Sequence, residues 1–181
     1  MRQFYIVDRI GTLRQGQVLN LERFNDLKPP QLQSHVDEMF PNGVSRHGER
    51  YFLKNSTYAS VASPAIELLF EYVRRAHFPE RPSRFQSWFA VDSITDAKGF
   101  RNRFGQGQGA IWRVASETVW QADMNLLTAH QTTLVCSWFA HTYWRGEAGP
   151  GQTFWEFLLT PPVHVLECIA EINSEQCGSG V

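Results

Sequence analysis

Three strand-like segments, far apart in the chain, constrain the fold more than any other feature. The first, Phe4-Tyr5-Ile6-Val7-Asp8-Arg9, is apolar and ends in a cation; the second spans residues 83–91, and the third, Trp155-Glu156-Phe157-Leu158-Leu159, carries a carboxylate. A sheet built from such segments needs long-range pairing, so the order predicts an α+β fold with a split β-sheet and one cleft. We expect Arg9, Ser87 and Glu156 to meet in that cleft.

Length and composition predict a single domain. The chain has 181 residues, of which 43% are hydrophobic and 13% aromatic, which is enough to build a core of ordinary size. The last residues are polar and rich in glycine and serine. We therefore expect one domain over residues 1–172 and a flexible tail over 173–181.

Periodicity and punctuation predict the other elements. Ser63, followed by Pro64, has the character of a helix N-cap and predicts a helix to about residue 78, whereas Ser93 or Thr95 would cap another. The run Gly105-Gln106-Gly107-Gln108-Gly109 follows that second helix, so it indicates a helix end and turn, not a phosphate loop. Further helices are expected over residues 31–40 and 132–144, and strands over residues 3–10, 18–21, 110–115, 154–160 and 163–169, with the first two of these strands paired.

The charge pattern leaves two interpretations open. The net charge of −1 gives the whole chain no electrostatic signature of a nucleic-acid-binding protein. The middle third is nevertheless basic, and its arginines could hold a phosphate-bearing ligand or a nucleic acid, or could form a solvated helix face. These arginines are Arg74, Arg75, Arg81, Arg84, Arg101 and Arg103.

Cysteine and histidine spacing predicts no metal site and a reducing compartment. The three cysteines form no CxxC pair, which together with the absence of a signal-like or membrane-spanning segment predicts a cytoplasmic protein without a membrane partner. The nearest metal-like spacings, His35 with Asp37 and His141 with Glu147, do not match known ligand sets. Cys136 lies in an apolar helical segment and is expected to be a buried thiol.

The three strand segments resemble the ADP-ribosyltransferase superfamily. In that superfamily the first strand ends in Arg or His, a central strand contributes Ser, Thr or Tyr, and a late strand carries Glu; the matching residues here are Arg9, Ser87 and Glu156. The segment 48–53, followed by the helix from Ser63, also resembles members that place an aromatic strand and then a helix beside the nicotinamide pocket, which implies a strand over residues 48–53. The chain is similar throughout to small bacterial proteins without an assigned function.

The resemblance implies an ADP-ribosyltransferase-like fold and NAD as substrate. Glu156 would stabilise the oxocarbenium-like centre formed when the nicotinamide–ribose bond breaks, because a fixed carboxylate opposes that developing charge. Arg9 would bind a phosphate or ribose oxygen, Ser87 would orient the ribose or the carboxylate, and Tyr5 or Tyr51 would stack on nicotinamide.

The resemblance also bears on the acceptor. The late strand lacks a Glu-x-Glu pair, and Gln152 stands four residues before Glu156, so a single-glutamate enzyme that modifies another group or a nucleic acid fits better than an arginine-modifying one. The implied activity is transfer of ADP-ribose to a protein or nucleic acid, or hydrolysis of NAD, in a toxin or defence effector. A protein inhibitor or antitoxin would be its partner.

Other functions remain open from the residues alone. Arg9 could be solvated, Ser87 could face water, and Glu156 could be the outward residue of an alternating strand. In that case the chain would be a non-enzymatic module that binds protein or nucleic acid on a transferase-like fold. The aromatic residues of segment 138–144 would then form core or a partner surface: Trp138, Phe139, Tyr143 and Trp144.

Overall fold

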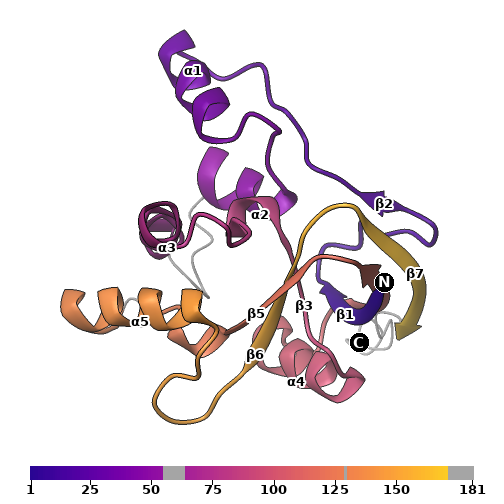
Figure 1. Cartoon of the computed structure of the whole chain (residues 1–181). Coiled ribbons are helices and arrows are strands. Elements are labelled where there is room, and N and C mark those ends of the chain that lie inside the picture. The colour runs from indigo at the N-terminus through magenta and orange to yellow at the C-terminus, as the bar shows by residue number, and fades with distance from the viewer. Residues whose placement is uncertain (55–63, 129, 171–181) are drawn as a thin grey trace, which may run out of the picture. The chain divides into compact units, whose positions relative to one another are not determined.

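The structure, a computed structural model, describes residues 1–54, 64–128 and 130–170. It is a mixed α+β fold with a four-stranded antiparallel sheet and a second, three-stranded sheet (Figure 1). The chain divides into two compact units: the first contains residues 1–19, 90–117 and those from 162 onward, and the second contains residues 20–89 and 118–161. The α+β class is thus confirmed, whereas the single domain stays a prediction, and the predicted tail at 173–181 lies outside the described residues.

The first unit is built on a four-stranded sheet of order β1-β4-β7-β2. Side chains of β1 alternate, so that Phe4, Ile6 and Asp8 are buried on one face. The predicted strands and the helix capped by Ser93 are confirmed here, with Gln106 in the left-handed conformation at the helix end. The elements are β1 Arg2–Asp8, β2 Val18–Leu19, α4 Ile94–Gly105, β4 Ala110–Ser116 and β7 Val163–Ala170.

The predicted pairing of the first two strands is wrong, because β2 pairs with β7. The cause is Asp8, whose buried carboxylate accepts four backbone N–H groups from the segment that follows it, at 2.6 to 3.1 Å. A carboxylate that gathers successive N–H groups imposes a tight turn in place of a hairpin. Beyond that turn, Gly16 N donates to Val165 O, and Val165 N donates to Gln17 O, which places the segment at β7.

The second unit has a small sheet of order β3-β6-β5 and five α- or π-helical segments. Its helix α3 is seen end-on in Figure 1, where α5 runs across the view, so the two helices cross at a large angle. The elements are α1 Pro30–Met39, α2 Arg46–Gly48, the π-helical turn η1 Glu49–Leu53, α3 Pro64–His77, the 3₁₀ turn η2 Arg84–Gln86, β3 Trp88–Ala90, β5 Val119–Asp123, the 3₁₀ turn η3 Met124–Leu126, α5 Thr133–Arg145 and β6 Trp155–Leu159.

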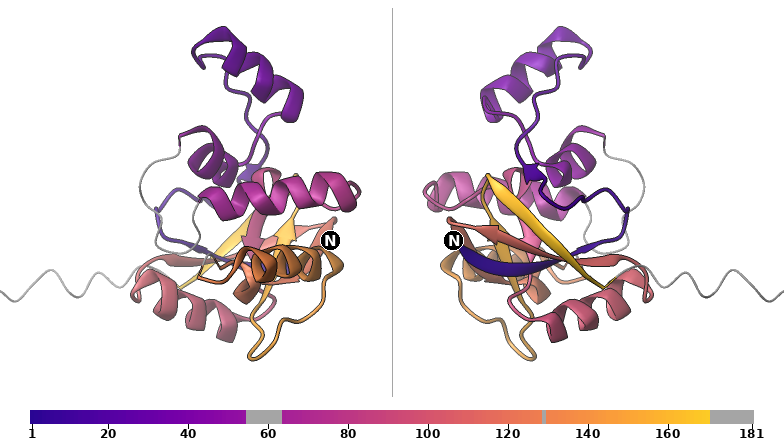
Figure 2. Two further views of the ribbon diagram at one scale, coloured as in Figure 1. Left: turned by 90° about the vertical axis from the view of Figure 1, so that its left-hand side faces the viewer. Right: turned by 90° about the vertical axis from the view of Figure 1, so that its right-hand side faces the viewer.

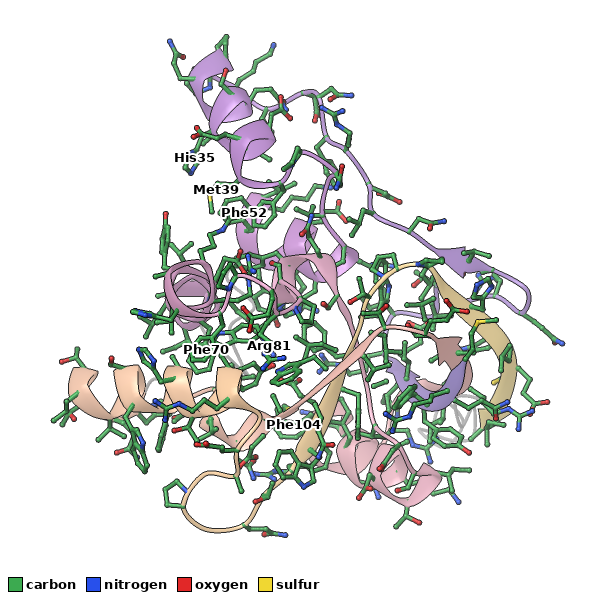
Figure 3. The ribbon with its side chains drawn as sticks, viewed as in Figure 1. His35, Met39, Phe52, Phe70, Arg81 and Phe104 are labelled. Atoms are coloured by element: carbon green, nitrogen blue, oxygen red, sulfur yellow. The ribbon has the colours of Figure 1, made fainter. Side chains whose placement is uncertain are left out.

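Aromatic side chains of α3 and α5 form the core of the second unit. Phe70, Tyr143 and Trp144 are fully buried, and Trp144 Nε1 donates to Phe70 O at 2.8 Å. The cluster expected to be core or partner surface is therefore core at three of its positions, whereas Trp138 is 49% exposed. A second, smaller cluster joins α1 to η1 and η2, and Figures 2 and 3 show α1 projecting from the helices below it, with Met39 and Phe52 at its base.

Two predictions about the second unit are wrong. Residues 48–53, expected as a strand, are helical, because Ser45 accepts from Gly48 N and starts a helix. The segment 83–91 begins with a 3₁₀ turn, since Ser83 accepts from Phe85 N, and only Trp88–Ala90 is a strand. Strand β5 was not predicted. In the described part of the chain, no helix combines the length and the apolar character that crossing a bilayer requires.

Gly48 tests the close packing of α2 on η2. A Cβ at Gly48 would lie 2.3 Å from Phe85 O and 2.7 Å from Val44 Cβ, so Gly48→Ala should lower the free energy of unfolding by about 1–3 kcal/mol. Gly99→Ala is the control: its Cβ meets nothing within 4 Å on the exposed side of α4, and it should stabilise by about 0.5–1 kcal/mol. Urea unfolding of both variants measures this, and equal effects would contradict the packing.

Candidate functional site

The centre of the candidate site is Arg84, a guanidinium buried between two carboxylates within the second unit. Its side chain is 4% exposed. Nε donates to Glu67 Oε2 at 2.7 Å and Nη2 donates to Glu67 Oε1 at 3.0 Å, which is a two-pronged pair. Nη1 donates to Glu156 Oε1 and also contacts the Tyr143 hydroxyl. One cation therefore links α3, η2, α5 and β6.

Glu156 enters this group from the second position of β6. It stands opposite Ala122 of β5, and its side chain, 6% exposed, points toward α5. Tyr143 donates its hydroxyl proton to Oε1 at 2.7 Å. Among the residues that the structure describes, both donors thus reach Oε1, and Oε2 of Glu156 accepts no hydrogen bond.

His47 and two aromatic rings close the other side of Arg84. His47 Nε2 lies 3.2 Å from Glu67 Oε1, and its ring packs on Tyr51 and Phe89 with centroids 4.5 and 4.6 Å apart. The Arg84 guanidinium lies over Phe89 at 4.5 Å. The pair of charges is therefore enclosed by π faces, which favour a cation and exclude water.

A second buried carboxylate on α3, Glu71, fixes the segment that carries Arg84. It accepts from Arg74, from Arg75 and, at 2.8 Å, from the Ser83 hydroxyl. Arg74 in turn donates to Pro79 O and Arg81 O. This network determines the path of the chain from α3 into η2 and so positions Arg84.

The buried charges balance. Three carboxylates, Glu67, Glu71 and Glu156, meet three guanidinium groups, Arg74, Arg75 and Arg84. Burial alone would raise the pKa of Glu67, but the charges of Arg84 and His47 lower it far below its ordinary value. Burial would likewise lower the pKa of Arg84, and the two carboxylates raise it. Burial raises the pKa of Tyr143, so its hydroxyl stays a donor.

The residues predicted for the site fall in both units. Glu156 and Ser87 belong to the second unit and are buried at 5% and 1%, so neither faces solvent. Ser87 donates to Ser83 O at 2.7 Å, and Tyr51 stacks on His47. Arg9 belongs to the first unit, where it is exposed, donates to Phe104 O at 3.1 Å and lies over Phe100.

Tyr5 also belongs to the first unit. It is half-buried in β1 and exchanges two backbone hydrogen bonds with Val91. Among the described residues, Glu156 thus makes no direct hydrogen bond to any of the other residues predicted for the site. The roles predicted for Arg9, Ser87, Tyr5 and Tyr51 remain predictions.

Sequence reasoning missed the residues that contact Glu156 directly. Arg84 was identified only as part of a basic stretch, and Glu67, Tyr143 and His47 were not assigned a role at the site. One signal was present: Glu67 and Glu71 stand four residues apart on the face of α3 that carries Phe70. Carboxylates on an apolar face need buried cations.

Of the interpretations left open for the basic stretch, a solvated helix face does not describe Arg74 and Arg84. Arg74 and Arg84 are 8% and 3% exposed, and with Arg75 they pair with buried carboxylates. Arg101 and Arg103 lie on α4 of the first unit. Within the described residues, no group of three or more His, Cys, Asp or Glu side chains could hold a metal ion. Cys136 is a buried free thiol, as predicted.

Residues 5–171 match the profile of a family described as "Protein of unknown function (DUF2441)". The chain belongs to the DUF2441 family. A comparison with curated proteins finds no match. All the residues of the Arg84 site lie within the matched region of this DUF2441 protein.

Arg84→Met tests the buried charge balance. Without the guanidinium, Glu67 and Glu156 face each other uncompensated, so the free energy of unfolding should fall by about 3–5 kcal/mol. Arg23→Met is the control, because Arg23 is 59% exposed and lies 3.9 Å from its only ion-pair partner among the described residues, Asp37. It should change stability by less than about 1 kcal/mol. Urea unfolding that gives equal losses would contradict the site.

Glu67→Gln tests the lowered pKa. In the unfolded chain Glu67 takes up a proton near its ordinary pKa of 4.5, whereas in the folded protein its pKa is far lower. The stabilisation is therefore present above that value and declines as pH falls, so wild-type stability should drop between about pH 5 and pH 3. Glu67→Gln should flatten this slope by up to about 1.4 kcal/mol per pH unit. Glu147→Gln, at an exposed carboxylate, should retain it.

Proposed function

We propose that this DUF2441 protein is an NAD-dependent enzyme that transfers ADP-ribose to a macromolecule, with Glu156 as the catalytic carboxylate. The observation that supports this most is the fixed geometry of Glu156. Oε1 is held by Tyr143 and Arg84, and among the described residues nothing donates to Oε2. One oxygen of this carboxylate is thus left without a donor, and the proposal requires the substrate to approach that oxygen at a residue that is 5% exposed.

The chemistry proposed for this oxygen is stabilisation of a cation. When the bond between nicotinamide and ribose breaks, nicotinamide leaves with the bonding electrons, and positive charge develops on the ribose carbon and ring oxygen. A carboxylate fixed before the reaction stabilises that charge without reorganising. An acceptor group on the macromolecule, or water, then attacks the same carbon and loses its proton.

The other residues carry supporting roles in this proposal. Arg84 and Tyr143 are positioning residues, since they act on Glu156 and not on the substrate. Ser87 stabilises the 3₁₀ turn that carries Arg84, through its bond to Ser83 O. Arg9 would bind phosphate or ribose oxygens, and Tyr5 or Tyr51 would stack on nicotinamide. Toxin or defence roles, a protein inhibitor or antitoxin as partner, and a cytoplasmic location belong to the same proposal.

Nicotinamide release tests the proposal. The purified protein is incubated with NAD, nicotinamide is quantified by chromatography, and NAD binding is measured by calorimetry. Glu156→Gln should lower the release rate about a hundredfold or more. Glu147→Gln, at a carboxylate 58% exposed, should keep the wild-type rate. A Glu156→Gln variant that releases nicotinamide at the wild-type rate would contradict the assignment of Glu156 as the catalytic carboxylate.

The Tyr143→Phe variant tests whether activity can be lowered without a loss of the folded structure. It retains both charges and removes one hydrogen bond to Glu156, so it should lower nicotinamide release about tenfold. Its circular dichroism spectrum should stay that of the wild type. Unchanged release would separate Tyr143 from the chemistry and contradict its positioning role.

A second function is favoured by exposed apolar residues on α5. Leu134 and Trp138, four residues apart, are 79% and 49% exposed. Such residues on one helix face are typical of a protein-binding surface. A non-enzymatic module of this kind predicts no heat of NAD binding and no nicotinamide release, so the same two measurements distinguish the functions.

A further inference from the structure

We propose that Arg81 and Trp120 form a binding subsite for phosphate oxygens, and that its ligand is the diphosphate of a dinucleotide. The inference rests on the proposed function for its choice of ligand. The site itself rests on the geometry of two side chains in the second unit. Neither side chain takes part in the Arg84 network.

The Arg81 guanidinium stacks on the Trp120 indole. Its central carbon lies 3.7 Å from the ring centroid, the shortest such distance among the cation–π contacts of the described residues. Stacking of this kind fixes the plane of a guanidinium while its edges remain able to donate. The Arg81 side chain is 33% exposed, so part of it is open to solvent although Nε is buried.

Two hydrogen-bond donors at this stack have no acceptor. Arg81 Nε and Trp120 Nε1 are buried, and neither makes a hydrogen bond to any residue that the structure describes. Glu80 Oε1 lies 3.3 Å from Arg81 Nε but outside hydrogen-bond geometry, and the Glu80 side chain is 61% exposed. A buried donor without a partner costs about 1–3 kcal/mol, which an incoming acceptor would recover.

The backbone holds this stack in place. Arg81 N donates to Phe78 O at 3.0 Å, and Arg81 O accepts from Arg74, which is anchored on Glu71. The turn at Gly146 passes beside the Trp120 ring, since a Cβ there would lie 3.1 Å from the ring. Figure 3 shows Arg81 among the side chains of the second unit. The donors are therefore preorganised.

The subsite lies on the same face of the sheet as Glu156. On β5, Trp120 stands opposite Leu158 and Ala122 stands opposite Glu156, so Trp120 and Glu156 belong to neighbouring pairs on one face. Pairs two residues apart along a strand are separated by about 7 Å. That spacing is comparable to the distance in NAD between the ribose carbon that bonds nicotinamide and the nearer phosphate.

The group that fits is an oxyanion with several acceptors. The stack offers only donors and a positive charge, and a guanidinium edge matches two phosphate oxygens at once. An indole N–H beside it can reach a third oxygen. The Glu80 carboxylate, 61% exposed, lies 3.3 Å from Arg81 Nε, so an oxyanion would replace that solvated partner, whereas a neutral hydroxyl or amide ligand could not replace its charge.

Calorimetric titration with ADP-ribose, and separately with inorganic pyrophosphate, tests the subsite without requiring turnover. Wild type should bind both, and Arg81→Gln should weaken each at least tenfold. Trp120→Phe, which keeps an aromatic face but loses the N–H, should weaken them about threefold. Arg103→Gln is the matched control: Arg103 also stacks on an aromatic ring, at 4.9 Å, and carries the same charge on α4. It should leave both affinities unchanged.

The outcomes separate this inference from the proposed function. Binding lost in Arg81→Gln but kept in Glu156→Gln supports the subsite, even if no nicotinamide is released. Nicotinamide release by wild type with unchanged binding in Arg81→Gln overturns the subsite and leaves the function standing. No binding of either probe by wild type, or equal weakening in Arg103→Gln, also overturns it.

Discussion

The ion pair of Arg84 with Glu67 and Glu156 is the constraint on which the second unit depends. It joins segments that are 17 and 72 residues apart in the sequence. Apolar contacts could be satisfied by many arrangements of α3, α5 and β6, because dispersion and burial have little directional preference. A two-pronged guanidinium pair has one geometry. The network therefore selects the arrangement in which these elements meet.

Stabilising a core with buried ion pairs carries a large desolvation cost. Removing charges from water costs several kcal/mol per ion, and a well-packed apolar substitute is often equally stable. Here the cost is offset because the three carboxylates and three guanidinium groups are matched, and because Ser83 and Tyr143 satisfy further hydrogen-bonding positions. Stability alone does not require this chemistry. Its directional pairing accounts for the arrangement of the elements, and the proposed role of Glu156 would give one member of the network a functional use as well.

The parts of the fold that depend on local rules could be predicted. Capping signals and the glycine run after α4 are local in the sequence, so α3 and α4 were expected, with Ser93 capping α4 and Pro64 beginning α3. The predicted cap Ser63 lies outside the described residues. Two local signals were overlooked: Asp8 gathers the N–H groups that follow it, and Ser45 caps the helical segment that includes residues 48–53. The pairing of β2 with β7 depends on a distant partner and could not be predicted. For the same reason Glu156 was identified as a candidate but Arg84, its partner, was not. The spacing of residues along the chain does not reveal which residues 72 positions apart will be in contact.

The partner changes what Glu156 can do. The charge of a carboxylate paired only with a guanidinium would be largely neutralised by that pair, and its effect on a distant cation would be small. Glu156 shares Arg84 with Glu67, which takes two of the three donating nitrogens, so the neutralisation of Glu156 is incomplete. Both of its described donors also reach the same oxygen. The second oxygen keeps its lone pairs, and its direction is fixed by the first. A carboxylate that is held rigidly, and that its permanent partner neutralises only partly, can still stabilise a positive charge that forms briefly on a substrate.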